Sequence, residues 1–278
     1  IFGKPDNLRK FEADGILAFE DPAETIYALA ALNRMRIGFE KALPKPPAIP
    51  AKTPKMPAKT LNEYEAKRLM KRAGVPSGKE NLVTSANDAA KAAAKIGFPV
   101  VMKIVSPDIL HKTEIGGVKL NLDSQAAVRK AYNEIMANAK KAAPNASIDG
   151  VLVAQMVKGG VETILGTFTD PTFGPVVMFG LGGIFAEVLK DVTFRVAPFG
   201  VREASQMIQE IKGAAMLKGA RGAPPADVQA LAKALSALSI FAVANADRLE
   251  SIDINPFLVM EKGKGGVALD ALLVPRQG

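Results

Sequence analysis

Apolar and polar positions follow two different periods along the chain from residue 61 onward. Apolar residues recur at helical spacing in five segments, which predicts helices over 62–74, 86–97, 124–142, 201–211 and 225–244. Short apolar runs predict strands over 98–105, 150–157, 162–168, 175–179, 249–254 and 267–269. Helices interspersed with strands in this way are typical of an α/β or α+β fold, for which we expect mixed sheets.

Capping and turn residues mark several of these boundaries. Asn62 is a candidate N-cap of the first helix and Gly74 is a candidate stop. The Asp170-Pro171 turn indicates that the strands 162–168 and 175–179 pair with each other.

The first 43 residues form a separate short segment. Residues 18–22 are interpreted as the end of a strand, and Asp21 followed by Pro22 is typical of a helix start. Apolar residues at helical spacing then predict a helix over 23–39. Because so short a segment cannot bury a core of its own, we expect 1–43 to be the tail of a preceding domain.

Residues 44–60 are predicted to be a linker. Prolines remove amide donors and fix φ, which favours a semi-rigid, polyproline-like conformation here. The six prolines are Pro44, Pro46, Pro47, Pro50, Pro54 and Pro57. The stretch 41–60 also has five lysines and no acidic residue, and so accounts for five of the net +8 charges. Since the charge is concentrated there and aromatic residues make up only 6% of the chain, we expect no nucleic-acid binding.

Residue types that are scarce restrict the chemistry further. The chain has no Cys and a single His, which excludes disulfides, cysteine nucleophiles and zinc sites built on Cys or His. No stretch of about 18 apolar residues is free of charges and helix breakers, so we expect no membrane span. Because the sequence starts at Ile1 without a signal-like segment, we expect a cytoplasmic fragment. Any imidazole chemistry must use His111.

His111 lies in a loop, 106–118, that follows a predicted buried strand. Such a loop could present the imidazole to a phosphoryl group while a partner holds the other ring nitrogen. The alternative is a solvent-facing histidine in a turn stabilised by Gly116 and Gly117. The residues alone leave both interpretations open.

Two further features could bind phosphate. Lys103 follows the apolar run 100–102, so its ammonium group either reaches solvent or points at an anion such as a nucleotide phosphate. A predicted strand ends in Gly182 and Gly183, whose N–H groups could converge on phosphate oxygens. A plain tight turn explains these glycines equally well.

Polar residues near the C-terminus suggest a cation site. Alternation along the strand places Asp253 and Asn255 on one face and apolar residues on the other. Asn255 and Asp270, on adjacent predicted strands, offer hard oxygen ligands for Mg²⁺, which uses few protein ligands. The alternative is a hairpin in which Asn255-Pro256 and the glycines of 263–266 are only turns.

Five motifs, in their order along the chain, resemble those of one known family. They are 106–118 (SPDILHKTEIGGV), 170–183 (DPTFGPVVMFGLGG), 187–194 (EVLKDVTF), 217–222 (LKGARG) and 253–256 (DINP). Residues 61 to about 275 strongly resemble the ATP-grasp portion of the NDP-forming acyl-CoA synthetases, relatives of succinyl-CoA synthetase. This implies an ATP-grasp fold of two interleaved subdomains over 61–278, with the main break near residue 150. Residues 1–43 are similar to the end of the CoA-ligase domain in fused members.

The resemblance also implies roles for individual residues. His111 matches the mobile phosphohistidine, which exchanges a phosphoryl group with the nucleotide, and Asp253 matches the acid that steadies a phosphohistidine. Lys103 matches the phosphate-binding lysine. Asn255 and Asp270 match the two protein ligands of Mg²⁺.

Further anion and nucleotide contacts follow from the same resemblance. The purine hinge is expected at Gln155, Met156 and Val157, with Glu162 as another nucleotide contact. The glycine-rich turn would supply the amides of Gly182 and Gly183 to the phosphates. The candidate anion-binding arginines are Arg195 and Arg221.

One departure limits what this chain is expected to do alone. In the family a second histidine, in the CoA-ligase domain, receives phosphate from the acyl-phosphate intermediate, and this chain has only one histidine. We therefore expect an acid–thiol ligase fragment that binds ATP or ADP with Mg²⁺ and phosphorylates His111 reversibly. CoA would bind to the missing domains of the same enzyme, which are the expected partners; a homo-oligomer remains open.

The alternative function is regulatory. One bacterial type of protein lysine acetyltransferase has a related synthetase-like region that senses ligands without turnover. Such regions are expected to lose the histidine or the metal ligands, whereas His111, Asn255 and Asp270 are all present. The chain also leaves no length for an acetyltransferase domain.

Overall fold

The structure is a computed structural model of the chain, in which residues 5–40, 45–109, 111–183, 191–219 and 222–276 are described. It divides into two compact units, Ile1–Lys45 and Pro46–Gly278, and each is described by itself. No helix among the described residues is both long and apolar enough to cross a bilayer.

The described part of the first unit consists of two helices, α1 (Pro5–Ala13) and α2 (Pro22–Glu40). The predicted helix over 23–39 is confirmed, and Asp21 caps it because its Oδ1 accepts a hydrogen bond from the Ala23 N–H at 2.6 Å. Of the strand end expected at 18–22, Phe19 alone is in a β-bridge, and α2 already begins at Pro22. No residue of α2 is buried, and large apolar side chains such as Leu29 and Phe39 are exposed.

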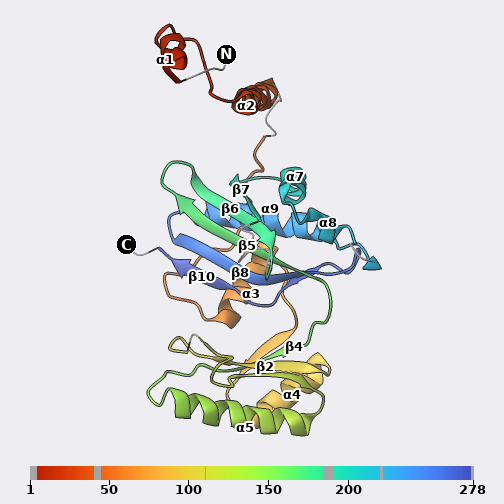
Figure 1. Cartoon of the computed structure of the whole chain (residues 1–278). Helices are drawn as coiled ribbons and strands as arrows, with labels where there is room; N and C mark the ends of the chain where they lie inside the picture. The colour runs from red at the N-terminus through yellow and green to blue at the C-terminus, as the bar shows by residue number, and fades with distance from the viewer. Residues whose placement is uncertain (1–4, 41–44, 110, 184–190, 220–221, 277–278) are drawn as a thin grey trace. The chain divides into compact units, whose positions relative to one another are not determined.

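The second unit contains a four-stranded sheet covered by two helices. Its strand order is β1 (Glu80–Val83), β4 (Gly150–Gln155), β2 (Val100–Val105) and β3 (Val118–Leu122). The helices α4 (Ala86–Ile96) and α5 (Gln125–Ala142) pack on one face of this sheet, as Figure 1 shows. Alanines and β-branched side chains from these elements form the smaller of two hydrophobic cores.

A second, larger sheet follows in the chain. Its main order is β10 (Leu272–Pro275), β8 (Leu249–Val259), β5 (Val161–Asp170), β6 (Gly174–Leu181) and β7 (Val192–Val196), and β9 (Gly266–Ala268) pairs with β8. Its core lies against α7 (Val201–Glu210), α8 (Ala214–Leu217) and α9 (Val228–Ala244). In Figure 1 α9 runs behind β6, and α7 and α8 lie at the right of this sheet.

Helix α3 (Glu63–Ala73) connects the two layers, since it contacts α9 and β10 as well as β1. Its start is fixed by a capping box: Asn62 Oδ1 accepts from the Glu65 N–H, and the Glu65 carboxylate accepts from the Asn62 N–H. Gly74 ends it in the left-handed conformation, with φ of 99°. Both predicted boundaries of this helix are therefore confirmed.

The expectation of mixed sheets is wrong, because every pairing between the described strands is antiparallel. β1 and β2, which α4 connects, do run in the same direction. However, β4 lies between them and pairs with both in the antiparallel sense. The order of helices and strands along a sequence indicates strand directions, but it does not tell which strands become neighbours.

The proposed division into 1–43, 44–60 and 61–278 remains a prediction, and two local observations bear on its details. Met56 and Leu61 are buried in the larger core, and the Met56 N–H donates to Asn245 Oδ1 at 2.7 Å. The chain passes from the smaller sheet to the larger one at residues 156–160, between β4 and β5. The cleft between the two layers is where the candidate site residues gather.

Candidate functional site

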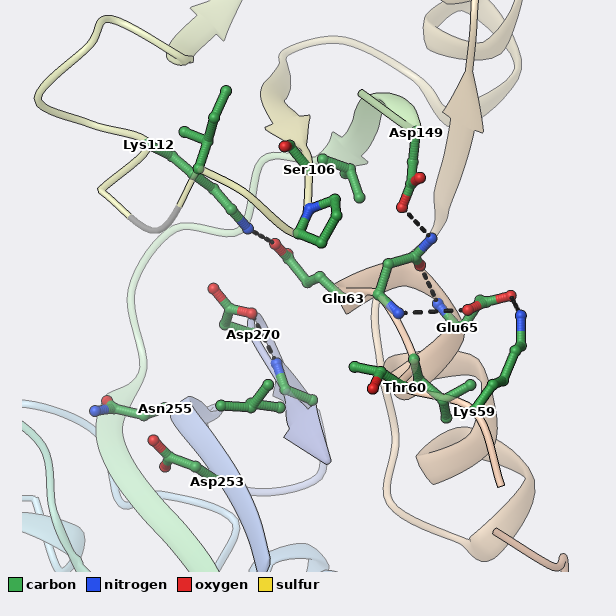
Figure 2. Close-up of a pocket in the computed structure, with 17 residues that line it drawn as sticks. Lys59, Thr60, Glu63, Glu65, Ser106, Lys112, Asp149, Asp253, Asn255 and Asp270 are labelled. Atoms are coloured by element: carbon green, nitrogen blue, oxygen red, sulfur yellow. Dashed lines mark hydrogen bonds and ion pairs between the residues drawn. The ribbon is translucent and has the colours of Figure 1, made fainter. Parts of the chain in front are cut away.

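A hollow of about 690 Å³ lies between the two sheets. The smaller sheet and α3 contribute Glu63, Ser106 and Lys112 to its lining, and the larger sheet contributes Asp253, Asn255 and Asp270. Figure 2 shows the three polar residues of the larger sheet near one another, with Lys112 reaching Glu63 from the opposite side. The fold thus brings together residues that are up to 207 positions apart in sequence, from Glu63 to Asp270.

Strand β8 presents two of these polar side chains to the hollow. Ile252 and Ile254 are buried in the core, so the alternation of the strand turns Asp253 and Asn255 outward, as predicted. The strand continues through Pro256 to Val259, so Asn255-Pro256 does not form a hairpin turn. Asp270 lies in the connection between β9 and β10 rather than on a strand, which corrects our expectation. It still faces β8, because both flanking strands pair with β8.

These oxygens suit a hard divalent cation. Burial, together with the negative charge of Asp270, raises the pKa of Asp253, so the two carboxylates repel each other. A bound cation would relieve that repulsion. No group of three or more His, Cys, Asp or Glu gathers as a metal site in the described part of the chain. The amide oxygen of Asn255 and the carboxylate of Asp270 fit Mg²⁺, because this ion uses one or two protein oxygens together with phosphate oxygens and water.

Glu63 is the centre of a cluster of lysines beside the hollow. Its side chain is only 4% exposed and lies in the first turn of α3. Oε1 is 2.9 Å from Lys67 Nζ and 3.3 Å from Lys103 Nζ, and Oε2 is 2.7 Å from Lys112 Nζ. Burial alone would raise the pKa of Glu63, but the positive charges of Lys103, Lys67 and Lys112 outweigh it and lower the pKa from 4.5 to about 2. Glu63 is thus a fixed, ionised acceptor.

Lys103 extends from β2 into the cleft. Its Nζ also donates to the Leu269 carbonyl at 3.3 Å and lies 3.8 Å from Asp270 Oδ2. The side chain is 21% exposed and turns toward the carboxylates of Glu63 and Asp270, while its contact with a nucleotide phosphate stays a prediction. The ammonium group therefore borders the carboxylate that would hold the cation.

His111 is exposed, with 77% of its side chain accessible, and Glu114 Oε1 lies 3.4 Å from its Nδ1. It lines a second hollow, of about 430 Å³, together with Lys103, Lys112 and Asp270. An exposed imidazole in the same hollow as a lysine and a candidate metal ligand can meet a phosphoryl group there.

The His111 loop is anchored at both ends. On its N-terminal side the Ser106 hydroxyl donates to the Ser147 carbonyl at 2.5 Å, and the Ser147 N–H donates to Asp108 Oδ2 at 2.7 Å. On its C-terminal side the Gly117 carbonyl accepts the Ile104 N–H of β2 at 2.8 Å, and the Gly117 N–H donates to the Lys112 carbonyl within the loop. A Cβ on Gly117 would lie 2.7 Å from Ile104 Cγ2, so a glycine is required at this close approach.

A smaller, mainly apolar pocket of about 150 Å³ adjoins Lys103. Gln155, Met156 and Val157 line it, at the point where the chain leaves the smaller sheet. Glu80 also lines it, and its Oε1 is a buried oxygen without a hydrogen-bond partner, while Oε2 is 2.7 Å from Lys67 Nζ. The size and apolar lining suit a flat heterocycle, with its chain of phosphates directed toward Lys103.

Comparison with known proteins supports one family. The ATP-grasp domain family matches residues 53–274. Subunit β of an ADP-forming acetate–CoA ligase from Pyrococcus furiosus is 46% identical over 76% of this chain and 90% of its own length. The chain belongs to the ATP-grasp family of ADP-forming acyl-CoA ligases. An ADP-forming 4-hydroxybutyrate–CoA ligase from Nitrosopumilus maritimus is 49% identical over 76% of this chain, which spans only 30% of that longer relative.

A solved structure is also similar to this chain. It is the acetyl-coenzyme A synthetase 1 of Ca. Korarchaeum cryptofilum, with a TM-score of 0.69 and 41% identity over 78% of this chain and 93% of that chain. That protein was captured with coenzyme A and Mg-AMPPCP, with its phosphohistidine segment pointing towards the nucleotide binding site. The predicted ATP-grasp fold is confirmed.

Other residues predicted to bind nucleotide or anions are placed less favourably in this ATP-grasp domain. Glu162 is exposed on β5, and its carbonyl accepts the Gly182 N–H at 2.8 Å, so that amide is already bonded. Gly183 has φ of +61° and open space around it. Arg195 is neutralised by ion pairs with Glu203 and Glu210. Arg221 lies outside the described residues.

The sequence interpretation missed Glu63, Lys67, Glu80 and Lys112. Glu63 and Lys67 are four residues apart on one helix, a spacing that brings opposite charges together. That signal was present, but it is also typical of solvated helix faces. Here Lys67 is only 1% exposed, because β1 supplies Glu80 as its second partner.

Proposed function

We propose that this chain is the nucleotide-binding, phosphohistidine-forming part of an ADP-forming acyl-CoA synthetase. The whole enzyme would convert an acid, CoA and ATP to acyl-CoA, ADP and phosphate. The observation that carries the proposal is the position of His111, which lines one hollow with Lys103 and Asp270. Similarity to ADP-forming ligases supports the reaction class.

ATP would bind along the cleft between the two sheets. Its base fits the small pocket at Gln155, Met156 and Val157. The exocyclic amino group of adenine is a donor, and Glu80 Oε1 is a buried acceptor that lacks one.

Charge neutralisation prepares the phosphates for transfer. Lys103 Nζ would contact the phosphate oxygens, and Asn255 and Asp270 would hold Mg²⁺ against them. When bound, Mg²⁺ would supply positive charge to the phosphate oxygens and so favour attack by a nucleophile. These are positioning and electrostatic contributions, which dominate phosphoryl transfer.

The nucleophile in this proposal is the neutral imidazole of His111. A bond forms between an imidazole nitrogen and the γ-phosphorus as the bond from that phosphorus to the β,γ-bridging oxygen breaks, and ADP leaves with the electron pair. The phosphorylated ring gains positive character, which the carboxylate of Asp253 would stabilise. Reversal of the same step regenerates ATP.

Completion of the reaction requires parts that this chain does not supply. With a single histidine, it has no second acceptor to take the phosphoryl group from an acyl phosphate. The partners proposed are CoA-binding and CoA-ligase domains of the same enzyme, as the longer relatives suggest. Residues 1–43 are proposed to be the end of such a domain.

The direct test is incubation with ATP and Mg²⁺, followed by intact-mass measurement at alkaline pH, where phosphohistidine is stable. We expect a gain of one phosphoryl group, reversed by added ADP, and no gain in H111N. D270N, which removes a cation ligand, should slow the gain by about tenfold or more. Nucleotide binding without modification of wild-type His111 would refute the proposal.

A further inference from the structure

We propose that Lys112 and Glu63 form a latch that holds the His111 segment at the nucleotide side of the cleft, so that Glu63 is a positioning residue for phosphoryl transfer. This inference rests on the proposed function of His111. It assigns a purpose to Glu63 and Lys112, which have no part in the transfer step itself.

The first argument is the sparse attachment of the segment between its two anchors. Described residues 111–115 lie between Ile109, which is buried, and Gly116. Among the described residues, Lys112 is the only one of 111–115 whose side chain forms a hydrogen bond or ion pair with another element. Its Nζ is 2.7 Å from Glu63 Oε2. The His111–Glu114 contact stays within the segment. Ile115 adds apolar packing against the smaller core.

The second argument is the rigidity of the acceptor. The Glu63 carboxylate is held by the buried Lys67 at 2.9 Å, and its helix begins at the capping box of Asn62 and Glu65. A carboxylate fixed in this way loses little conformational entropy when Lys112 binds it. With 4% of Glu63 exposed, water and salt screen this pair less than a surface pair.

The third argument is the position of Lys112 in sequence. It is the residue directly after His111, and both line the hollow that also contains Lys103 and Asp270. Fixing the Lys112 ammonium group therefore restricts His111 to the neighbourhood of the proposed phosphates. Glu63 also contacts Lys103. One carboxylate therefore sets the positions of Lys103, which would bind phosphate, and of Lys112, which is next to His111.

The test compares lysine variants of the whole chain. K112M removes the latch but leaves the contacts of Glu63 with Lys67 and Lys103, while K112R keeps a cation. K119M is the matched control, because Lys119 makes an ion pair of the same 2.7 Å length with Glu134 outside the cleft. Two measurements are made: amide hydrogen exchange of 111–116 without nucleotide, and the rate of His111 phosphorylation at saturating ATP and Mg²⁺.

We expect K112M to exchange the 111–116 amides faster and to phosphorylate His111 about ten- to a hundredfold more slowly, with less than about a threefold change in ATP affinity. K112R and K119M should resemble wild type in both measurements. Unchanged exchange in K112M overturns the latch, even if phosphorylation slows, since Lys112 would then act on the phosphate directly. Unmodified wild-type His111 would instead refute the proposed function, and the exchange measurement would still report on the latch.

Discussion

Glu63 shows how one buried carboxylate can organise a site. Three ammonium groups share its two oxygens, and their attraction exceeds the cost of removing the carboxylate from water. The cluster depends on Glu63, because its loss would remove the acceptor that Lys67, Lys103 and Lys112 share. Its strength should therefore vary with the ionisation of Glu63.

The first prediction is a dependence of stability on acid pH. The pKa of Glu63 is about 2 in the folded chain against an ordinary 4.5, so its contribution is present above pH 4.5 and is lost as the pH falls toward 2. The contribution to the free energy of unfolding at neutral pH is roughly 3 kcal/mol. Urea unfolding of wild type and E63Q should show a large difference at pH 6 that shrinks steadily on acidification.

A matched control for this prediction is E134Q. Glu134 also forms an ion pair with a lysine, but the pair is exposed, so its removal should change stability little at any pH. A difference between wild type and E63Q that stays constant from pH 6 to pH 3 would contradict the assigned ionisation of Glu63.

At the level of elements, the connection between β2 and β3 places the nucleophile. The backbone closes this connection at Gly117, whose N–H bonds the Lys112 carbonyl and whose carbonyl accepts the Ile104 N–H at 2.8 Å. The close approach of Gly117 to Ile104 and to the Lys112 carbonyl leaves no room for a side chain. The loop conformation thus depends on a residue that performs no chemistry.

The second prediction is that G117A disturbs the His111 loop. The added Cβ would lie 2.8 Å from the Lys112 carbonyl oxygen. Relief of this clash requires a shift of the backbone, which costs more free energy than a change of side-chain rotamer. We expect a loss of about 1–3 kcal/mol of stability and slower His111 phosphorylation. G200A is the control, since Gly200 has φ of −87° and open space around it. Equal thermal unfolding midpoints for the two variants would contradict this account.

Much of the element pattern could be predicted from the sequence because it depends on local signals. Asn62 and Gly74 fix α3, and alternation along β8 places Asp253 and Asn255 on the open face. Short strands such as β1, with four residues, have too few positions to show an alternation of apolar and polar residues, so β1 was not predicted. The partners of Glu63 were not predictable from periodicity, because Lys103 and Lys112 lie 40 and 49 residues away. The prediction of mixed sheets was wrong for the same reason, because a sequence does not show that β4 lies between β1 and β2.

For the molecule as a whole, the candidate site belongs entirely to the second unit, Pro46–Gly278. Each of its two layers has its own hydrophobic core, and the cleft between them contains the polar residues. The described helices of the first unit add no residue to either core.

The third prediction is therefore that residues 46–278 fold and bind nucleotide without residues 1–45. Since the described residues of both hydrophobic cores all lie from Met56 onward, the deletion takes no residue from either core, and the thermal unfolding midpoint should stay within about 2 °C. Nucleotide affinity, measured by calorimetry, should be unchanged. A large drop in either quantity would show that the first unit supports the second.

The anchors of the His111 loop also limit how far a phosphoryl group can be carried. His111 follows the buried Ile109 by two residues, and extended chain spans at most about 3.6 Å per residue, so its Cα stays within roughly 7 Å of that of Ile109 while the anchor holds. An acceptor group in another domain must therefore approach His111 within this range. Movement of His111 beyond this range requires that Ile109 first leave its buried position.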